Sequence, residues 1–344
     1  FKWGVDMSKR IKWVDTTKFL GIFAIYLGHF GPSIGKSFEL VYAYHVALFF
    51  FLSGCMSTYD HENNIFKFIK KKFKKIMIPF FIFSFISLIF YILLEDSSLQ
   101  QVLQQVKIVI RGNIRNEFFA GSLWFLSCLF LMEVIFKVLK KINNKLIIFL
   151  ICLAIFLIFN TLIKPTPLES PKLLYNLDTA FFYLIFYAIG YITYPKIIDL
   201  FELNTKSKKI IFITLGIIFS IYASVEFFKH DSLFNFLSTT PIIKNIAPIL
   251  RALPLIGLNI IVARLLDKIT LFNEIGRETL FLCGNEFLIK SMAEALITFV
   301  GLNCNLSYAL QVYLYTMILL IIGIKLIIPF EKKLGNSILY EFKK

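Results

Sequence analysis

The sequence predicts an all-α membrane protein, a polytopic helical bundle of about ten transmembrane helices. Hydrophobic residues make up 58% of the 344 residues and charged residues only 17%, whereas soluble domains carry about 25% charged residues. The 40 Phe residues supply more apolar surface than one soluble core can cover, so part of it must face lipid. The apolar residues also form long runs, and a run of about 20 residues is enough to cross a bilayer as a helix.

Each expected span is one such run with polar residues at its ends. Helix is the expected state because a helix satisfies its backbone hydrogen bonds internally in lipid. We expect one membrane domain over 14–329, a cytoplasmic N-terminal segment over 1–13 and a cytoplasmic tail over 330–344. Met7 is the expected natural start, with residues 1–6 as an added remnant. The runs lie at residues 14–34, 39–58, 76–94, 122–139, 146–163, 177–194, 210–228, 246–266, 278–300 and 308–329.

The distribution of basic residues predicts the topology. With the N-terminus inside, the cytoplasmic segments hold 25 of the 37 Lys and Arg residues, the exterior loops hold eight, and four lie within spans. Loops on the cytoplasmic side of a membrane carry such an excess. We therefore expect a plasma-membrane protein with both ends in the cytoplasm. The abundance of Lys, Ile, Asn and Phe favours a bacterial origin.

The net charge of +15 does not indicate a nucleic-acid partner. The basic residues lie in short loops between apolar runs, where they mark topology and contact anionic lipid. The expected partner is the bilayer, and the sequence specifies no oligomeric state. No metal site is expected, because the five Cys residues show neither a CxxC pair nor another metal-ligand spacing.

The first span carries the strongest candidate residues, because ionisable groups inside a span are costly unless they pair or line a wet cavity. Lys18 and His29 are eleven residues apart, which is three helical turns plus about 20°, so both project from one face, about 16 Å apart along the axis. Asp15 lies one turn before Lys18 and is expected to pair with it.

A second histidine is expected at similar depth. His45 lies about two turns into the second span, which is joined to the first by a short loop. A neutral imidazole can accept a proton from a hydroxyl near pH 7, as a general base does. His29 is equally compatible with a buried structural role, and His45 fits a histidine bonded to a backbone carbonyl slightly better.

Two further polar clusters stand out. Lys71 and Lys75 lie one turn apart at the cytoplasmic mouth of the third span, where they could hold phosphates as point charges, although topology alone explains most lysines there. In the ninth span, Glu286 and Lys290 have the i, i+4 spacing of a helical ion pair, and polar groups this deep usually face the bundle interior.

Together these features resemble the acyltransferase-3 family of membrane acyltransferases, especially its fucose 4-O-acetylase-like branch. The resemblance extends over almost the whole chain. It rests on the spacing from Lys18 to His29, on the segment 44–54 with the sequence YHVALFFFLSG, and on the segment 122–126 with the sequence SLWFL. Lys71 and Lys75 are similar to a pair of arginines that the family often carries before a proline. Many relatives have a histidine where this chain has Glu286.

The resemblance implies transfer of an acyl group, usually acetyl from cytoplasmic acetyl-CoA as co-substrate, to a hydroxyl of a carbohydrate or lipid-linked glycan at the cell surface. Our hypothesis is that His29 and His45 are the catalytic residues: His29 deprotonates the acceptor hydroxyl or relays the acetyl group, and His45 orients His29 or stabilises charge. Lys18, Lys71 and Lys75 would bind the phosphates of acetyl-CoA. We expect the substrates to contact four further residues: Asp15, Trp124, Asn285 and Glu286.

Two other functions remain compatible with the residues. A transporter of a small solute or glycolipid would also carry charged groups at mid-depth, although the internal repeats common in transporters are absent from this sequence. A membrane anchor or sensor without catalysis would not need so many ionisable residues within its spans.

Overall fold

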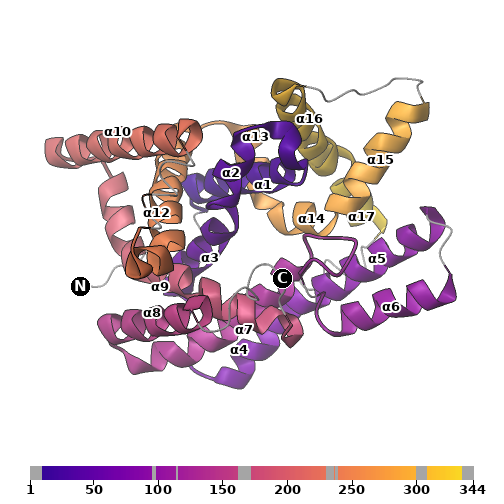
Figure 1. Cartoon of the computed structure of the whole chain (residues 1–344), viewed down its shortest axis with the longest axis horizontal. Helices are drawn as coiled ribbons and strands as arrows, with labels where there is room; N and C mark the ends of the chain where they lie inside the picture. The colour runs from indigo at the N-terminus through magenta and orange to yellow at the C-terminus, as the bar shows by residue number, and fades with distance from the viewer. Residues whose placement is uncertain are drawn as a thin grey trace.

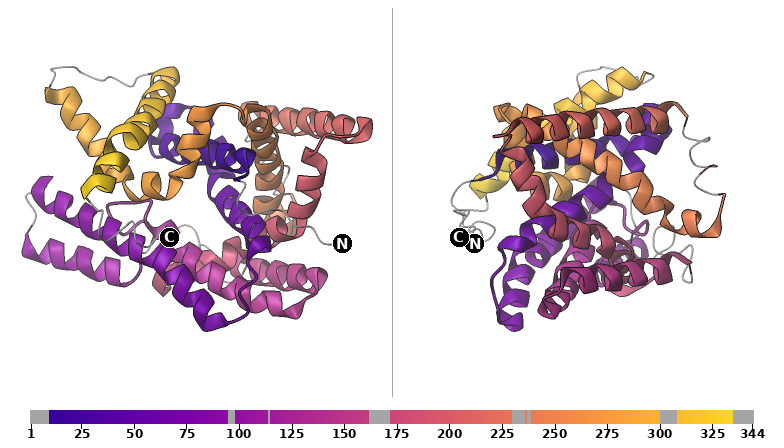
Figure 2. Two further views of the ribbon diagram at one scale, coloured as in Figure 1. Left: turned by 180° about the vertical axis from the view of Figure 1, so that it is seen from behind. Right: turned by 90° about the vertical axis from the view of Figure 1, so that its left-hand side faces the viewer.

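The computed structural model describes residues 10–94, 98–113, 115–161, 172–229, 236, 239–299 and 308–334. Within these ranges every regular element is a helix, as the sequence predicts (Figure 1). The expected terminal segments 1–13 and 330–344 lie largely outside the described residues. In both views along the short axis, α10 lies at one end of the molecule and the hairpin of α5 and α6 at the other (Figures 1 and 2).

Six segments are long and apolar enough to cross a membrane. Each matches one of the expected apolar runs. The segments are Ser37–Tyr59, Ile65–Leu93, Leu174–Phe201, Lys206–Phe228, Ile243–Leu266 and Ala309–Glu331.

The other four expected runs form shorter helices. The helices α1 (Lys12–Gly28), α7 (Trp124–Leu139) and α8 (Lys145–Thr161) have 17, 16 and 17 residues. A full crossing needs about 20 residues. The expected single span at 278–300 is instead divided into α14 (Thr279–Gly284) and α15 (Glu286–Phe299). The count of ten spans therefore stays a prediction.

One helix, α6, lies between the expected spans 76–94 and 122–139. Its 12 residues are too few to cross a membrane. The other bounds are α2 (Ser37–Tyr42), α3 (His45–Met56), α4 (Ile65–Lys72), α5 (Ile78–Leu94), α6 (Leu99–Ile110), α9 (Leu177–Phe201), α10 (Lys206–Phe228), α12 (Pro241–Leu266), α13 (Thr270–Arg277), α16 (Ala309–Ile322) and α17 (Ile328–Leu334).

Two wide helical turns join neighbouring helices without a loop. A π-helical turn over Phe73–Met77 continues α4 into α5, and another over Gly323–Ile327 continues α16 into α17. Turns of this kind are rare and usually occur singly within α-helices. The lysine-rich segment that begins with α4 is thus continuous with an apolar helix.

Two large apolar clusters and a smaller one between α1, α2 and α16 form the core of the described residues. One large cluster joins residues of α3, α7, α8, α9 and α12, and the other joins residues of α1, α5, α14, α15 and α16. Phe125 and Leu129 of α7 pack against both clusters. The helix α7 therefore lies at the boundary between the two halves of the core.

Close backbone contact fixes α3 against α9. A Cβ atom added at Gly54 would lie 2.0 Å from the carbonyl oxygen of Tyr187, and one added at Gly190 would lie 2.0 Å from the carbonyl oxygen of Phe51. Neither backbone can yield without moving its helix. Glycine at both positions lets the two helix axes approach to this distance.

This contact predicts that Gly190→Ala destabilises the protein. Overpacking of a filled core costs about 1–3 kcal/mol, and here the obstacle is backbone rather than a movable side chain. Thermal unfolding in detergent should show a lower Tm for Gly190→Ala. The control is Gly121→Ala, where an added Cβ meets nothing within 4 Å. Equal melting temperatures for the two variants would contradict the proposed packing constraint.

Candidate functional site

One face of α1 lines a partly open cavity of about 230 Å³. Lys18, Ile22 and Ile25 contribute to its wall. They are spaced by four and three residues, so they form one stripe along the helix. His29 is the next position on this stripe, four residues beyond Ile25, although it does not itself line the cavity. Of the stripe that the sequence predicts from Lys18 to His29, the part from Lys18 to Ile25 lines the cavity and His29 lies beyond it.

Four helices enclose this cavity, which we call the inner cavity. Besides α1 they are α3, α7 and α14, and most of the wall is apolar. The segment of α2 and α3 runs antiparallel to α1, because Gly21 meets Leu48 and Phe49 of α3 whereas Gly28 meets Val41 and Tyr42 of α2. The wall residues Lys18 of α1 and Met56 of α3 therefore lie at the same end.

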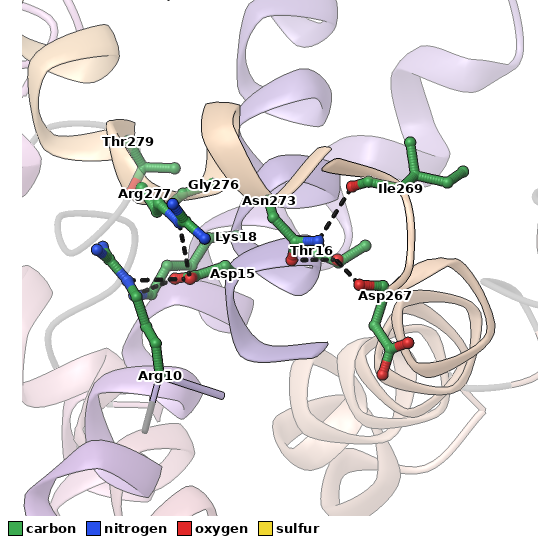
Figure 3. A network of polar contacts seen from close by, with 10 residues as sticks. All are labelled: Arg10, Asp15, Thr16, Lys18, Asp267, Ile269, Asn273, Gly276, Arg277 and Thr279. Carbon is green, nitrogen blue, oxygen red and sulfur yellow. Dashed lines mark hydrogen bonds and ion pairs between the residues drawn. The ribbon is translucent and has the colours of Figure 1, made fainter. Parts of the chain in front are cut away.

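Lys18, at that end of the inner cavity, belongs to a cluster of charges that Figure 3 shows. The Asp15 carboxylate is buried and lies 3.7 Å from Lys18 Nζ, 3.1 Å from Arg10 Nε and 3.7 Å from Arg277 Nε. The expected pairing of Asp15 with Lys18 is present. One carboxylate serves three cations, so the cluster keeps a positive excess suited to an anionic ligand. Asp15 itself does not line the inner cavity.

A second ion pair lies at the same end. Glu133 of α7 lines the inner cavity, and its carboxylate pairs with Lys72. The two neighbouring lysines of the sequence prediction, Lys71 and Lys75, are exposed instead. Lys72 was missed because a run of adjacent lysines does not reveal which of them faces the bundle.

At the far end of the stripe, His29 contacts a buried carboxylate. His29 Nδ1 lies 2.6 Å from Glu286 Oε1, and the same oxygen accepts a hydrogen bond of 2.7 Å from Lys290 Nζ. Glu286 is 4% exposed, whereas the side chain of His29 is 32% exposed. The expected pairing of Glu286 with Lys290 is confirmed. The contact with His29, which joins residues 257 positions apart, was not predicted.

The helix break before α15 places Glu286 in this contact. Glu286 is the first residue of α15, where free backbone N–H groups and the helix dipole favour a negative charge. Just before the break, the Tyr26 hydroxyl donates a hydrogen bond of 2.6 Å to the carbonyl of Leu282, which holds α14 against α1.

This arrangement can perform general-base chemistry. With Glu286 ionised, a neutral His29 keeps its proton on Nδ1 and leaves Nε2 as a lone-pair acceptor. A carboxylate beside Nδ1 orients the imidazole and stabilises the imidazolium that forms when Nε2 takes a proton. The partly exposed ring leaves room for a substrate hydroxyl.

His45 lies beside the same helix end. It is buried, and its Nδ1 lies 2.6 Å from the carbonyl oxygen of Val41, one turn earlier. Its ring meets the edge of Tyr42 at 5.0 Å. Val41 and Tyr42 are also the residues that pack on Gly28, next to His29. The two histidines therefore flank one contact between α1 and the segment before α3.

The last two candidates lie outside the inner cavity. Trp124 begins α7 and is 8% exposed, with the guanidinium of Arg115 at 4.7 Å from its ring centre. Asn285 occupies the helix break and donates a hydrogen bond of 2.9 Å to Glu331 of α17. Both are close in sequence to residues of the site, and neither contacts His29 among the interactions of the described residues.

In the part of the chain that the structure describes, no group of three or more His, Cys, Asp or Glu side chains could hold a metal ion. Four cysteines, Cys55, Cys128, Cys152 and Cys283, are free and buried. The fifth, Cys304, lies outside the described residues.

Comparison with known proteins assigns the chain to a family. No curated protein and no solved structure matches it. A family model described as an acyltransferase domain, the acyltransferase-3 model, matches residues 11–329. The match includes all of α1, the inner cavity and the contact of His29 with Glu286. The chain therefore belongs to the acyltransferase-3 family of membrane acyltransferases.

Proposed function

We propose that the protein transfers an acetyl or similar acyl group from acetyl-CoA to a hydroxyl of a cell-surface or exported carbohydrate, or of its lipid-linked precursor. The observation that carries the proposal is the single stripe of α1. It has a cation, Lys18, at one end of an apolar cavity and a carboxylate-supported imidazole, His29, beyond the other end. Family membership supports acyl transfer as the reaction class.

The inner cavity suits the flexible arm of the donor. The positions of Lys18 and His29 differ by eleven residues, which corresponds to about 16 Å along a helix. An extended pantetheine arm can cover such a distance. The donor diphosphate would then lie near Lys18 and the exposed lysines Lys71 and Lys75, and the thioester would lie beside His29.

The transfer itself would use His29 as the base. Nε2 of His29 takes the proton of the acceptor hydroxyl, the oxygen attacks the thioester carbonyl carbon, and a C–O bond forms. The C–S bond then breaks, and the leaving thiolate takes the proton from the imidazolium. Glu286 stabilises the imidazolium between these steps. His45 and Trp124 would support the acceptor on the side of His29 away from the inner cavity.

The proposed setting is a bacterial plasma membrane with both chain ends in the cytoplasm. The bias of Lys and Arg towards alternate loops supports this orientation, and it puts the Lys18 end of the inner cavity on the side where acetyl-CoA is made. The segment 44–54 supports the fucose 4-O-acetylase-like branch, whose members act on sugar hydroxyls.

One observation favours a transporter as a second candidate. The break between α14 and α15 puts the polar Asn285 and Glu286 inside the expected ninth span, and transporters bind substrates at such breaks. Purified protein in liposomes separates the two functions. Transfer of radiolabelled acetyl from acetyl-CoA to a glycan supports the enzyme, whereas glycan or solute uptake without acyl transfer would overturn it.

The general-base role predicts a large loss of activity in His29→Ala. General-base catalysis contributes about 10²–10⁴-fold to a rate, so kcat for acetyl transfer should fall by at least about 100-fold, with little change in Tm. The exposed Lys209 of α10 provides the control variant, Lys209→Ala. Full glycan acetylation in cells that carry His29→Ala would refute the assignment.

Glu286→Gln should lower kcat while leaving KM for acetyl-CoA unchanged. The amide keeps the shape of Glu286 but cannot stabilise the imidazolium, and the same carboxylate-to-amide change behind the general-base histidine of a serine protease lowers kcat by about 10⁴-fold. Steady-state kinetics would check this split. Glu274→Gln, which removes a carboxylate paired with Lys325 nearer the protein surface, is the matched control. A raised KM with normal kcat would instead make Glu286 a binding residue.

Replacement of both Lys71 and Lys75 by Gln should raise KM for acetyl-CoA without lowering kcat. The two ammonium groups would attract the donor diphosphate without touching the reacting atoms, and each charge contributes modestly because both are exposed. The control replaces the exposed Lys67 and Lys70 of the same segment. An unchanged KM would mean that Lys71 and Lys75 only orient the protein in the membrane and do not bind the donor.

A further inference from the structure

A second, polar cavity lies beyond the charged end of the inner cavity. It has a volume of about 520 Å³, and we call it the outer cavity. It lies at the ends of α3 and α7, where both helices leave the predicted membrane region. Its wall contains Lys137, Lys140, Lys141, Asp60, His61 and Tyr191, with other polar residues. None of the proposed catalytic residues contributes to it.

The two cavities follow each other along α7. Glu133 lines the inner cavity and Lys137, one turn further, lines the outer cavity. On α3 and the turn after it, the same order holds for Met56 and Thr58. A ligand that entered through the outer cavity would therefore continue towards the inner cavity and His29.

Phe68 connects an ion pair beside the inner cavity with one at the outer cavity. Lys72 Nζ and Lys137 Nζ lie 5.4 Å and 4.9 Å from the centre of the Phe68 ring. Lys72 pairs with Glu133 on the inner side, and Lys137 pairs with Asp60 on the outer side.

The outer cavity carries positive charge that its carboxylates do not balance. Lys140 donates hydrogen bonds to two backbone carbonyls, Ser57 at 2.7 Å and Asp60 at 3.1 Å. Among the described residues neither Lys140 nor Lys141 forms an ion pair. The carboxylate of Glu62, which also lines the cavity, accepts a hydrogen bond from the backbone N–H of Asn64 at 2.9 Å.

Burial, together with the nearby charge of Lys137, lowers the pKa of Lys140. A bound anion would relieve both effects.

We propose that the outer cavity binds the phosphorylated nucleoside end of the acyl donor, with Lys140 and Lys141 on its 3′-phosphate. This inference rests on the proposed function. His45, at the level of His29, and Asp60 are 15 residues apart, about 22 Å at helical rise. A donor whose thioester reaches His29 through the inner cavity therefore has its nucleotide at this depth. Ammonium groups of lysine bind phosphate as point charges.

The test compares acetyl-CoA with acetyl-dephospho-CoA, which lacks only the 3′-phosphate. For the wild-type protein in liposomes, KM should be about tenfold higher for the dephospho donor, because one charge-assisted contact is worth about a factor of ten. Lys140→Gln and Lys141→Gln should raise KM for acetyl-CoA and leave KM for the dephospho donor unchanged. Lys140→Arg should retain the preference, and Lys209→Gln, an exposed lysine on α10, is the control.

The outcomes separate this inference from the proposed function. If the variants keep the full preference for acetyl-CoA, or lose affinity for both donors equally, the outer cavity does not bind the 3′-phosphate, although acetyl transfer stands. If neither donor supports transfer, the proposed function fails. Calorimetric binding of adenosine 3′,5′-bisphosphate and of 5′-AMP to the purified protein then decides the inference, and equal affinities would overturn it. The exposed Lys141 provides a result even if Lys140 variants do not fold.

Discussion

The candidate site depends on how closely α13 and α14 run along α1. A Cβ atom added at Gly276 would lie 1.7 Å from the carbonyl oxygen of Asp15, so glycine is required for the two helices to meet. From this contact α13 runs antiparallel to α1, with the stacked rings of Phe19 and Phe272 4.1 Å apart. The next helix, α14, returns along α1, where the Tyr26 hydroxyl donates a hydrogen bond to the Leu282 carbonyl, and this brings Glu286 beside His29. The position of the carboxylate at the imidazole follows from this alignment.

Charge pairing is the second constraint. A buried ion without a partner destabilises a protein by several kcal/mol, and within lipid the cost is no smaller. Glu286, Glu133 and Asp15 are buried, and each lies beside at least one cation. The cations are more exposed than their partners. The site therefore combines fixed negative charges with cations that a ligand can reach.

The sequence predicted which residues lie together on one helix, but it did not predict contacts between residues far apart in the chain. Helical spacing predicted the stripe of Lys18 and His29 and the pair of Glu286 and Lys290, because both lie within one helix. The contact of His29 with Glu286 depends on a helix break that an apolar run does not reveal. Likewise, the run of lysines predicted a basic cytoplasmic end for the third span, but only tertiary packing determines that Lys72 faces inward. Hydropathy found all six long spans, whereas shorter helices left the count of ten untested.

The π-helical turn over Phe73–Met77 bears on this selection of Lys72. Eight ordinary helical residues separate Lys72 from the buried Phe80, a rotation of about 80° beyond two full turns at about 100° per residue. A π turn accommodates one extra residue, so the rotation falls to within about 20° of a common direction. The Lys72 ammonium near the aqueous boundary and the Phe80 ring deeper in the membrane therefore lie on the same side of one continuous helical segment. The irregular turn sets the helical phase, and with it which ammonium group reaches the interior.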